Sequence, residues 1–497
     1  MRDTRRDSTA RPAWLLLLAL AVLAPAAAEQ PAIVTDEEAL FGGAEPAAQA
    51  PPSAKSGGLV TVVDEADLAK NIDKNLLVGK GAEIGGEYNF ELKPAWTWQG
   101  SPLGPENLGS AAYSSALDPL LETKLHFDSR PDENFRVFGK VWASYPFAAP
   151  GDWSGSFKLL ELFADYNFDR AVFLRAGKQT VKWGVGYFYS PADVLSLAAI
   201  DAEKPEDERE GPVALKLHVP VGLDNYYLYL ISQNVSTPEA VALAPKAELL
   251  IGNLELALAA YYRPDLATRP RAILMATFPF FDLDLFTESV LAYGSERGYV
   301  EKGPAGLLVS TRKDELFFQG SLGLRYQRMD GLQGLSLIAQ YLFNGLGYQN
   351  PSVFVDNPQA VQLLLAQKRI GPADLALRGM HYLSARFSID RYRESDFGFS
   401  LFLMANFSDG SGRLVPELNY GTAKNVTVRF KLPVNYGDPG SEYSPSGAII
   451  APTLRFDLYE RASAELGLPL GFAKAGGWYE WRTLGLAMDL VLGYGKF

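Results

Sequence analysis

Charged side chains recur at alternate positions within otherwise apolar stretches of this chain. Arg429 and Lys431 lie two residues apart, and Arg455 and Asp457 repeat that spacing. Residues two apart in a β-strand point to the same face of the sheet, so each pair would project together. Charges fixed along one face of a wall attract ions and decide which ions pass beside it. The spacing therefore points to solute binding or passage.

The groups that usually carry catalysis are scarce. The chain contains no cysteine, which excludes thiolate metal sites and cysteine nucleophiles. Its three histidines, His126, His218 and His381, form no HxH or HExxH pattern and have no recognisable nucleophile motif beside them. Gly184 and Gly186 lack the third glycine of a dinucleotide-binding loop. A net charge of −12 disfavours nucleic-acid binding. We therefore expect no enzyme activity, catalytic residue, metal or cofactor.

The charged positions lie in segments where large apolar residues alternate with polar or small ones. In 425–436, Val426, Val428 and Phe430 share one face. Thr427 lies between them on the other face. This period of two is that of a β-strand. About twenty segments show it, namely 82–92, 116–127, 134–145, 157–168, 171–183, 212–221, 224–232, 245–251, 253–262, 270–281, 283–293, 315–328, 334–344, 379–391, 396–407, 413–420, 425–436, 448–459, 461–470 and 482–496.

So many half-apolar strands need a partner for their apolar faces, and the chain offers no second layer. A closed barrel whose apolar face lies in lipid satisfies its backbone hydrogen bonds without one. Short turns alternate with longer connections, notably 184–211, 294–314 and 345–378. We predict an all-β, transmembrane antiparallel β-barrel of about twenty strands, with short periplasmic turns and long extracellular loops. The count falls to about eighteen if 245–251 and 253–262 merge or an early segment is not a strand.

The two ends of the chain differ from the strand-rich part. Residues 1–28 combine a basic start, an apolar core and an Ala-rich end, the pattern of a secretory signal peptide. Residues 29–80 are predicted to be a flexible periplasmic segment, and 81–497 the barrel. The segment 482–496 resembles the terminal strand of bacterial outer-membrane barrels. That resemblance implies that Phe497 is a signal for the barrel assembly machinery, although the alternating leucines are one residue out of phase with it.

Strand parity assigns a set of charged side chains to the interior of this barrel. The predicted pore-lining residues are Arg136, Lys140, Arg175, Lys216, Arg325, Arg386, Arg429, Lys431, Arg455, Glu161, Asp165, Asp390 and Asp457. Basic groups outnumber acidic ones in this set, which favours a channel with a preference for anions. Acids in loops are expected to matter less than the wall, because salt screens them. Alternatively, the inward charges pair across strands and only fill a wet interior.

The stretch 175–193 has the most distinctive composition. It contains Gly177, Lys178, Gln179, Trp183, Gly184, Ser190, Pro191 and Asp193. Their spacing resembles a segment of porin-like bacterial outer-membrane barrels, broadly the relatives of phosphate-selective and alginate-export-type porins. The glycines at 177 and 184 would allow close approach or a bend where a strand leaves the wall. The aromatic residues at 183 and 187–189 suit a girdle at the membrane interface. A structural role for the motif is favoured over ligand contact.

Two further segments leave alternatives open. The acidic loop 201–210 lies either in solvent outside the barrel or folded into it. The stretch 359–369 is expected to form a short helix that either constricts the lumen or packs on the surface.

Together these features predict a porin-like channel in the bacterial outer membrane for passive diffusion of small polar solutes, anionic ones included. The expected partners are outer-membrane lipid, the barrel assembly machinery and the solutes, with no nucleic acid. The oligomeric state stays open. The alternative from another class is a structural or adhesive surface protein whose barrel is blocked by its own loops.

The N-terminal pattern gives a direct prediction of processing. We expect cleavage after Ala28, because the small residues there follow an apolar core of signal-peptide length. N-terminal sequencing of the protein from an outer-membrane fraction should begin at Glu29. A protein that keeps Met1, or that fractionates with the soluble periplasm, would contradict this assignment.

Overall fold

The computed structural model describes residues 82–99, 113–147, 155–233, 237–264, 270–304, 306–423, 426–445, 449–450 and 453–466. The predicted signal peptide, the 29–80 segment, the 482–496 strand and Phe497 lie outside the described residues. Within the described part of the chain, no helix is both long enough and apolar enough to cross a membrane.

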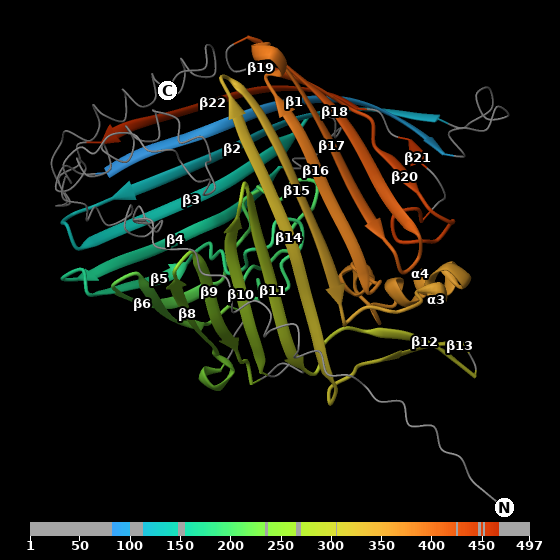
Figure 1. Ribbon diagram of the computed structural model, residues 1–497, viewed down its shortest axis with the longest axis horizontal. Helices are drawn as coiled ribbons and strands as arrows, with labels where there is room; N and C mark the ends of the chain where they lie inside the picture. The colour runs from blue at the N-terminus through green and yellow to red at the C-terminus, as the bar shows by residue number, and fades with distance from the viewer. Residues whose placement is uncertain are drawn as a thin grey trace, which may run out of the picture. The chain divides into compact units, whose positions relative to one another are not determined.

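One large antiparallel sheet dominates the described residues, which confirms the predicted all-β class (Figure 1). Period-two alternation over most of the chain accounts for it, because alternating residues can place one apolar and one polar face on the same strand. The strands of this sheet are β1 (Ala82–Gln99), β2 (Tyr113–Ser129), β3 (Phe135–Pro146), β4 (Ser156–Phe168), β5 (Val172–Lys178), β6 (Val213–Val221), β7 (Asp224–Ile231), β8 (Ala242–Ile251), β9 (Leu254–Tyr261), β10 (Arg271–Phe280), β11 (Leu283–Tyr293), β14 (Leu316–Asp330), β15 (Gln333–Asn344), β16 (His381–Asp390), β17 (Phe397–Asn406), β18 (Ser411–Ala423), β19 (Val426–Lys431), β20 (Val434–Tyr436), β21 (Ile449–Ile450) and β22 (Thr453–Leu466).

Successive strands pair with one another, and the last described strand returns to the first. β1 pairs with β2 along one edge and with β22 along the other, where Ala82 lies opposite Leu466. Short turns join many neighbours. In the turn after β4, Asp169 and Arg170 both have positive φ, of 49° and 59°. This conformation matches the twist of a tight hairpin, so the chain reverses there without splaying the two strands.

The strand count differs in detail from the prediction. β19 and β20 both pair with β18, and β21 and β22 both pair with β1, so each couple occupies one position around the sheet. β8 and β9 stay separate, at a turn where Gly252 has a φ of 63°. The predicted strands 448–459 and 461–470 are not separated at Glu460, because β22 runs through that residue in continuous register with β1. A single acidic residue did not interrupt the pairing.

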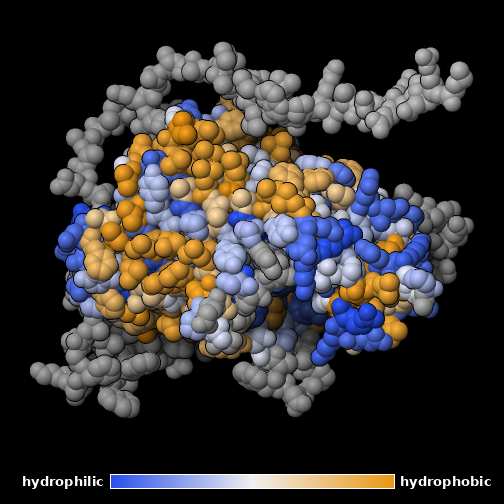
Figure 2. All heavy atoms as spheres, turned by 90° about the horizontal axis from the view of Figure 1, so that it is seen from below, coloured by the Kyte–Doolittle hydropathy of each residue, from blue (hydrophilic) through white to orange (hydrophobic). Residues whose placement is uncertain are grey.

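The inner and outer faces of the sheet differ as alternation predicts. On β14, Leu322 is 60% exposed, whereas its neighbour Ser321 is 3% exposed. On β17, Phe399 is exposed and Phe402 is buried. Figure 2 shows that apolar side chains form broad patches over the view presented there. Large apolar patches are unfavourable in water but suit contact with lipid.

A small cap of loop elements stands beside the large sheet. It consists of the hairpin β12 (Tyr299–Gly303) and β13 (Gly306–Ser310) with the helices α3 (Ser352–Asp356), α4 (Pro358–Ala366) and α5 (Pro372–Leu375). Val300 on the hairpin packs with Phe354 of α3 and Leu364 of α4. The predicted helix in 359–369 therefore exists as α4, and its buried face packs against the hairpin.

The face assignment can be tested by placing a charge on either side of the wall. Leu401→Arg or Phe430→Arg should lower the free energy of unfolding in a bilayer by about 2–4 kcal/mol, the cost of a cation on the lipid face near mid-membrane. Thr427→Arg should cost much less, because Thr427 borders the interior cavity. Equal losses of stability in all three variants, measured by denaturant unfolding in liposomes, would show that the faces are misassigned.

Candidate functional site

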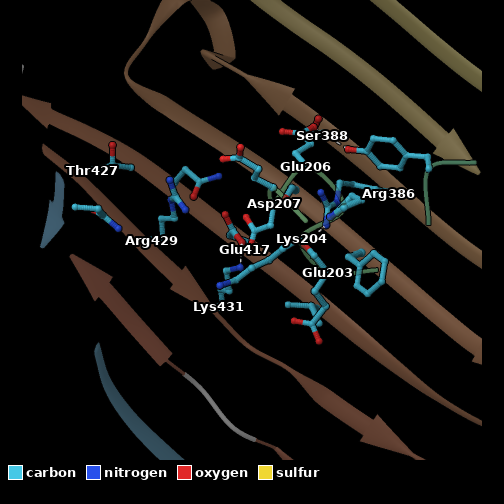
Figure 3. Close-up of a pocket in the computed structure, with 18 of the residues that line it drawn as sticks. Glu203, Lys204, Glu206, Asp207, Arg386, Ser388, Glu417, Thr427, Arg429 and Lys431 are labelled. Carbon is cyan, nitrogen blue, oxygen red and sulfur yellow. Dashed lines mark hydrogen bonds and ion pairs between the residues drawn. The ribbon is translucent and has the colours of Figure 1, made fainter. Parts of the chain in front are cut away.

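A polar cavity of about 1060 Å³ lies among the inner faces of the strands. Residues of β1 to β4 border one side of it, and residues of β14 to β19 border the other. Residues 203–208, which belong to the connection between β5 and β6, also line it. Figure 3 shows this connection lying against the wall that carries Arg386, Arg429 and Lys431. The alternative in which loop 201–210 folds inward is therefore the observed one.

The chain leaves the wall at the end of β5, five residues before the predicted strand end at 183. Gly177 has a φ of 133° there, and a Cβ at this position would lie 2.2 Å from the carbonyl oxygen of Leu162 on β4. Only glycine fits so close to a neighbouring backbone at that φ. Of the two roles expected for Gly177, the structure shows the close approach, and the chain leaves the wall after Lys178.

A buried carboxylate on β11 holds the first part of this connection, residues 184–193, which we call the elbow. Glu288 is fully buried. Its oxygens accept hydrogen bonds from the backbone N–H of Gly186 at 2.6 Å, the hydroxyl of Ser190 at 2.9 Å and the backbone N–H of Ala192 at 3.0 Å. A buried charge is tolerated when such donors replace water. Glu288 therefore fixes both ends of the elbow.

A buried amide on β15 holds the middle of the elbow. The side-chain oxygen of Gln340 accepts from the backbone N–H groups of Tyr187, Phe188 and Tyr189 at 3.0, 2.7 and 3.2 Å. Its Nε2 donates to the carbonyl oxygen of Tyr189 at 2.6 Å. No pattern in the sequence singled out Glu288 and Gln340. Each shares its strand face with another polar residue, Asp284 on β11 and Ser336 on β15, so parity alone did not distinguish them.

The elbow glycine that matched the motif has a steric role. A Cβ on Gly184 would lie 1.7 Å from Ser190 Oγ and 2.5 Å from Glu288 Oε1. Any larger residue would push the hydroxyl and the carboxylate out of hydrogen-bonding position. One compact turn thus contains Gly184, Ser190 and Pro191. Their role in it is structural.

The aromatic residues of the motif do not form the predicted girdle at the membrane interface. Trp183 and Phe188 are each 1% exposed. Trp183 packs with Tyr229 and Met275 against the β7 and β10 side of the interior. Phe188 packs with Phe402 and others on the β15 to β18 side. Because the chain turns inward after Gly177, these rings fill the interior rather than facing lipid.

The remaining motif residues tie the connection to itself and to the wall. Lys178 forms an ion pair with Glu210. Gln179 is 1% exposed, and its Nε2 donates to the carbonyl oxygen of Ala214 at 3.0 Å. Asp193 lies 2.6 Å from a guanidinium nitrogen of Arg209. The start and the end of the connection are therefore held together.

The acidic residues of the connection reach two separate parts of the wall. Glu208 lies 2.7 Å from Lys140 Nζ on β3, and Glu203 lies 2.7 Å from Arg413 Nε on β18. Tyr187 donates its hydroxyl to Glu206 at 2.9 Å. Burial, together with the Glu206 carboxylate, raises the pKa of Tyr187 to about 12, so this hydroxyl stays protonated as a donor.

The predicted pore-lining residues fall into four groups. Those that border the cavity are Arg325, Arg386, Asp390, Arg429 and Lys431. Those buried beside neighbouring charges or rings of the wall, away from the cavity lining in the described residues, are Arg136, Asp165, Arg175 and Lys216. Lys140 pairs with Glu208, as above, and Glu161 accepts from the backbone N–H of Thr180 at 3.0 Å. Arg455 and Asp457 belong to β22, and their side chains lie outside what the structure describes.

The buried group shows why strand parity alone assigns too many residues to the pore lining. Arg175 Nε lies 2.6 Å from Asp165 Oδ1, and Asp165 is 1% exposed. Arg136 Nε lies 2.9 Å from Asp128. Inward charges on adjacent strands can satisfy one another within the wall, and a pair bonded in this way does not need to face water.

The cavity lining contains acidic and basic groups in nearly equal number. The basic side chains are Lys124, Lys158, Lys204, Arg325, Arg386, Arg429 and Lys431. The acidic side chains are Glu87, Glu122, Glu203, Glu206, Asp207, Glu208, Asp390 and Glu417. Half of these acids come from the inward connection. The net basic lumen expected from the strands alone is therefore offset by a loop that parity could not place.

Comparison with known proteins gives weak similarity only. No protein-family model matches the chain, and no curated protein matches it. Among solved structures, it is similar to OccAB1 of Acinetobacter baumannii, with 11% identity, a TM-score of 0.42, and coverage of 76% of this chain and 96% of that chain. It is similar to OccK2 of Pseudomonas aeruginosa in complex with glucuronate, with 13% identity, a TM-score of 0.42, and coverage of 76% and 98%. It is also similar to OccK5 of Pseudomonas aeruginosa, with 10% identity, a TM-score of 0.43, and coverage of 78% and 99%.

The anchoring role of Glu288 can be measured through the elbow. Glu288→Ala leaves the N–H groups of Gly186 and Ala192 without an acceptor, so the free energy of unfolding should fall by about 3 kcal/mol. Cleavage by a glutamate-specific protease after the exposed Glu206 should become faster than in the parent protein. Glu301→Ala, which removes a carboxylate from the surface hairpin, is the matched control. Identical cleavage rates and stabilities in the two variants would show that Glu288 does not hold the elbow.

Proposed function

We propose that this chain is an outer-membrane channel through which small polar solutes diffuse passively, anionic solutes included. The polar cavity carries the proposal. Water occupies about 30 Å³ per molecule in the liquid, so a cavity of about 1060 Å³ has room for tens of waters. A sheet with an apolar outer face and a hydrated interior has the properties of a pore-forming wall in lipid.

The inward connection supports a channel of restricted width. Its elbow and aromatic residues pack on the β7 to β11 and β15 to β18 parts of the inner surface, through Trp183 and Phe188. The polar cavity occupies the space between the β1 to β4 side and the β14 to β19 side. A passing solute would therefore move beside the connection rather than through an empty barrel.

The charges around the cavity support selection by charge pattern. Arg386 and Arg429 lie on one wall, and Glu206 and Asp207 of the connection lie against it (Figure 3). Opposed charges across a narrow, low-dielectric opening create a field that orients polar molecules. We infer that the negative group of a solute travels along the arginine-bearing wall, so an anion preference would come from this wall and not from the net charge of the lining.

The location and partners follow from the same proposal. The signal-like residues 1–28 and the apolar outer face favour delivery to the outer membrane, with lipid and the barrel assembly machinery as partners. The rival hypothesis is a surface protein with a blocked barrel. That hypothesis also explains the inward connection, but it gives the polar cavity no role.

Conductance across a planar bilayer tests the channel and its charge preference together. The purified protein should form pores, and its reversal potential in a KCl gradient should show anion preference. Arg429→Glu with Lys431→Glu should shift that potential toward cations, because both residues border the cavity. The control is Lys302→Glu with Arg312→Glu, which makes the same charge change on β12 and on the segment that follows β13.

The outcomes separate the two parts of the proposal. Absence of any conductance in the parent protein would overturn the channel. Conductance with cation preference, or with the same shift in both double variants, would overturn the role of the arginine-bearing wall and leave the channel intact.

A further inference from the structure

The second part of the inward connection, residues 198–208, forms a separate unit that we call the arm. Its base is closed by the Asp193–Arg209 ion pair and by a hydrogen bond from Leu197 N to Glu210 O at 2.9 Å. Beyond the base, Gly211 packs so closely on Gln179 that a Cβ would lie 1.8 Å from its carbonyl oxygen. The two ends of the arm are thus held next to each other at its base.

The tip of the arm has its own local structure. Lys204 N donates to Asp201 O at 2.9 Å, and Asp207 N donates to Lys204 O at 3.0 Å, which makes two consecutive turns. Among residues 201–208, Ala202 is the side chain that joins an apolar cluster, with 8% exposure. Apolar packing by a single methyl group holds a segment only weakly.

Charge contacts hold the arm to two separate parts of the wall. Glu208 reaches Lys140 at 2.7 Å and Lys124 at 3.5 Å on the β2 and β3 side. Glu203 reaches Arg413 at 2.7 Å, and its carbonyl oxygen accepts from Arg386, on the β16 to β18 side. These ion pairs are partly exposed, with 21% exposure for the Glu208 side chain and 31% for that of Arg413. The arm therefore spans the cavity by contacts that face water.

We propose that the arm is an electrostatic gate, tethered across the passage at low ionic strength and released when salt screens Glu203 and Glu208 from the walls. This inference rests on the proposed channel. The screening length falls from about 10 Å at 0.1 M salt to about 3 Å at 1 M, and partly exposed ion pairs weaken accordingly. The elbow is unaffected, because buried hydrogen bonds to Glu288 and Gln340 hold it. The arm would thus move while the elbow stays in place.

Spin labelling reports the arm without requiring conduction. The chain has no cysteine, so Asp207→Cys gives one labelling site on the exposed tip. The label should become more mobile between about 0.1 M and about 1 M KCl. With Glu203→Gln and Glu208→Gln added, it should be mobile at both salt concentrations. A label at Asp314→Cys, on an exposed loop outside the arm, should be insensitive to salt and to these substitutions.

Conductance gives the second readout. Divided by the bulk conductivity, the parent conductance should rise about two-fold or more from low to high salt as the arm is released. Glu203→Gln with Glu208→Gln should remove that rise, because the normalised conductance should already be high at low salt. Lys140→Gln with Arg413→Gln should do the same from the wall side, which guards against a folding defect in one variant. Glu206→Gln with Asp207→Asn, which removes equal charge from the arm, should keep the rise.

Each result decides one claim. A label as immobile at high salt as at low salt, or tether variants that match the Glu206 and Asp207 control, would overturn the gate. A label released by salt in a protein that conducts nothing would keep the mobile arm and overturn the channel on which the gate depends.

Discussion

Lipid offers no hydrogen-bond partner to a backbone, so each N–H and C=O of the wall must bond to the neighbouring strand. The pairing of β22 with β1 meets this requirement where the sheet would otherwise end. The same requirement dictates the side-chain pattern, because a strand paired on both edges has only its two faces left to contact lipid or interior. The apolar outer face and the polar interior are two consequences of one constraint.

Buried polar groups on the inner face of the wall hold the inward connection in place. Glu288 and Gln340 collect the backbone donors of the elbow and hold it without exposed charge. The arm is held differently, by partly exposed ion pairs such as Glu208 with Lys140. One connection thus combines a rigid elbow and a salt-sensitive arm, because buried hydrogen bonds are insensitive to salt whereas exposed ion pairs are screened.

Period-two patterning predicted most strands and their faces correctly, since each strand carries its own signal. It could not show that β22 continues through Glu460, because the pairing of that residue with Tyr88 on β1 is a contact between distant parts of the chain. The connection after β5 was harder, since its aromatic residues fit a membrane girdle and a packed interior equally well. Only the turn at Gly177, made in contact with Leu162 of another strand, decides between the two. The site depends on contacts such as that of Gly186 with Glu288, which are a hundred residues apart and leave no local pattern.

The central claim is that one face of the strands borders a water-filled passage, and cysteine accessibility tests it most directly. In this cysteine-free chain, Thr427→Cys should react rapidly with a charged, water-soluble thiol reagent and lose conductance as it reacts, because Thr427 borders the cavity. Val428→Cys, on the opposite face of β19, should react slowly and keep its conductance. Equal reactivity at both positions, or modification of Thr427→Cys without any change in conductance, would contradict the account.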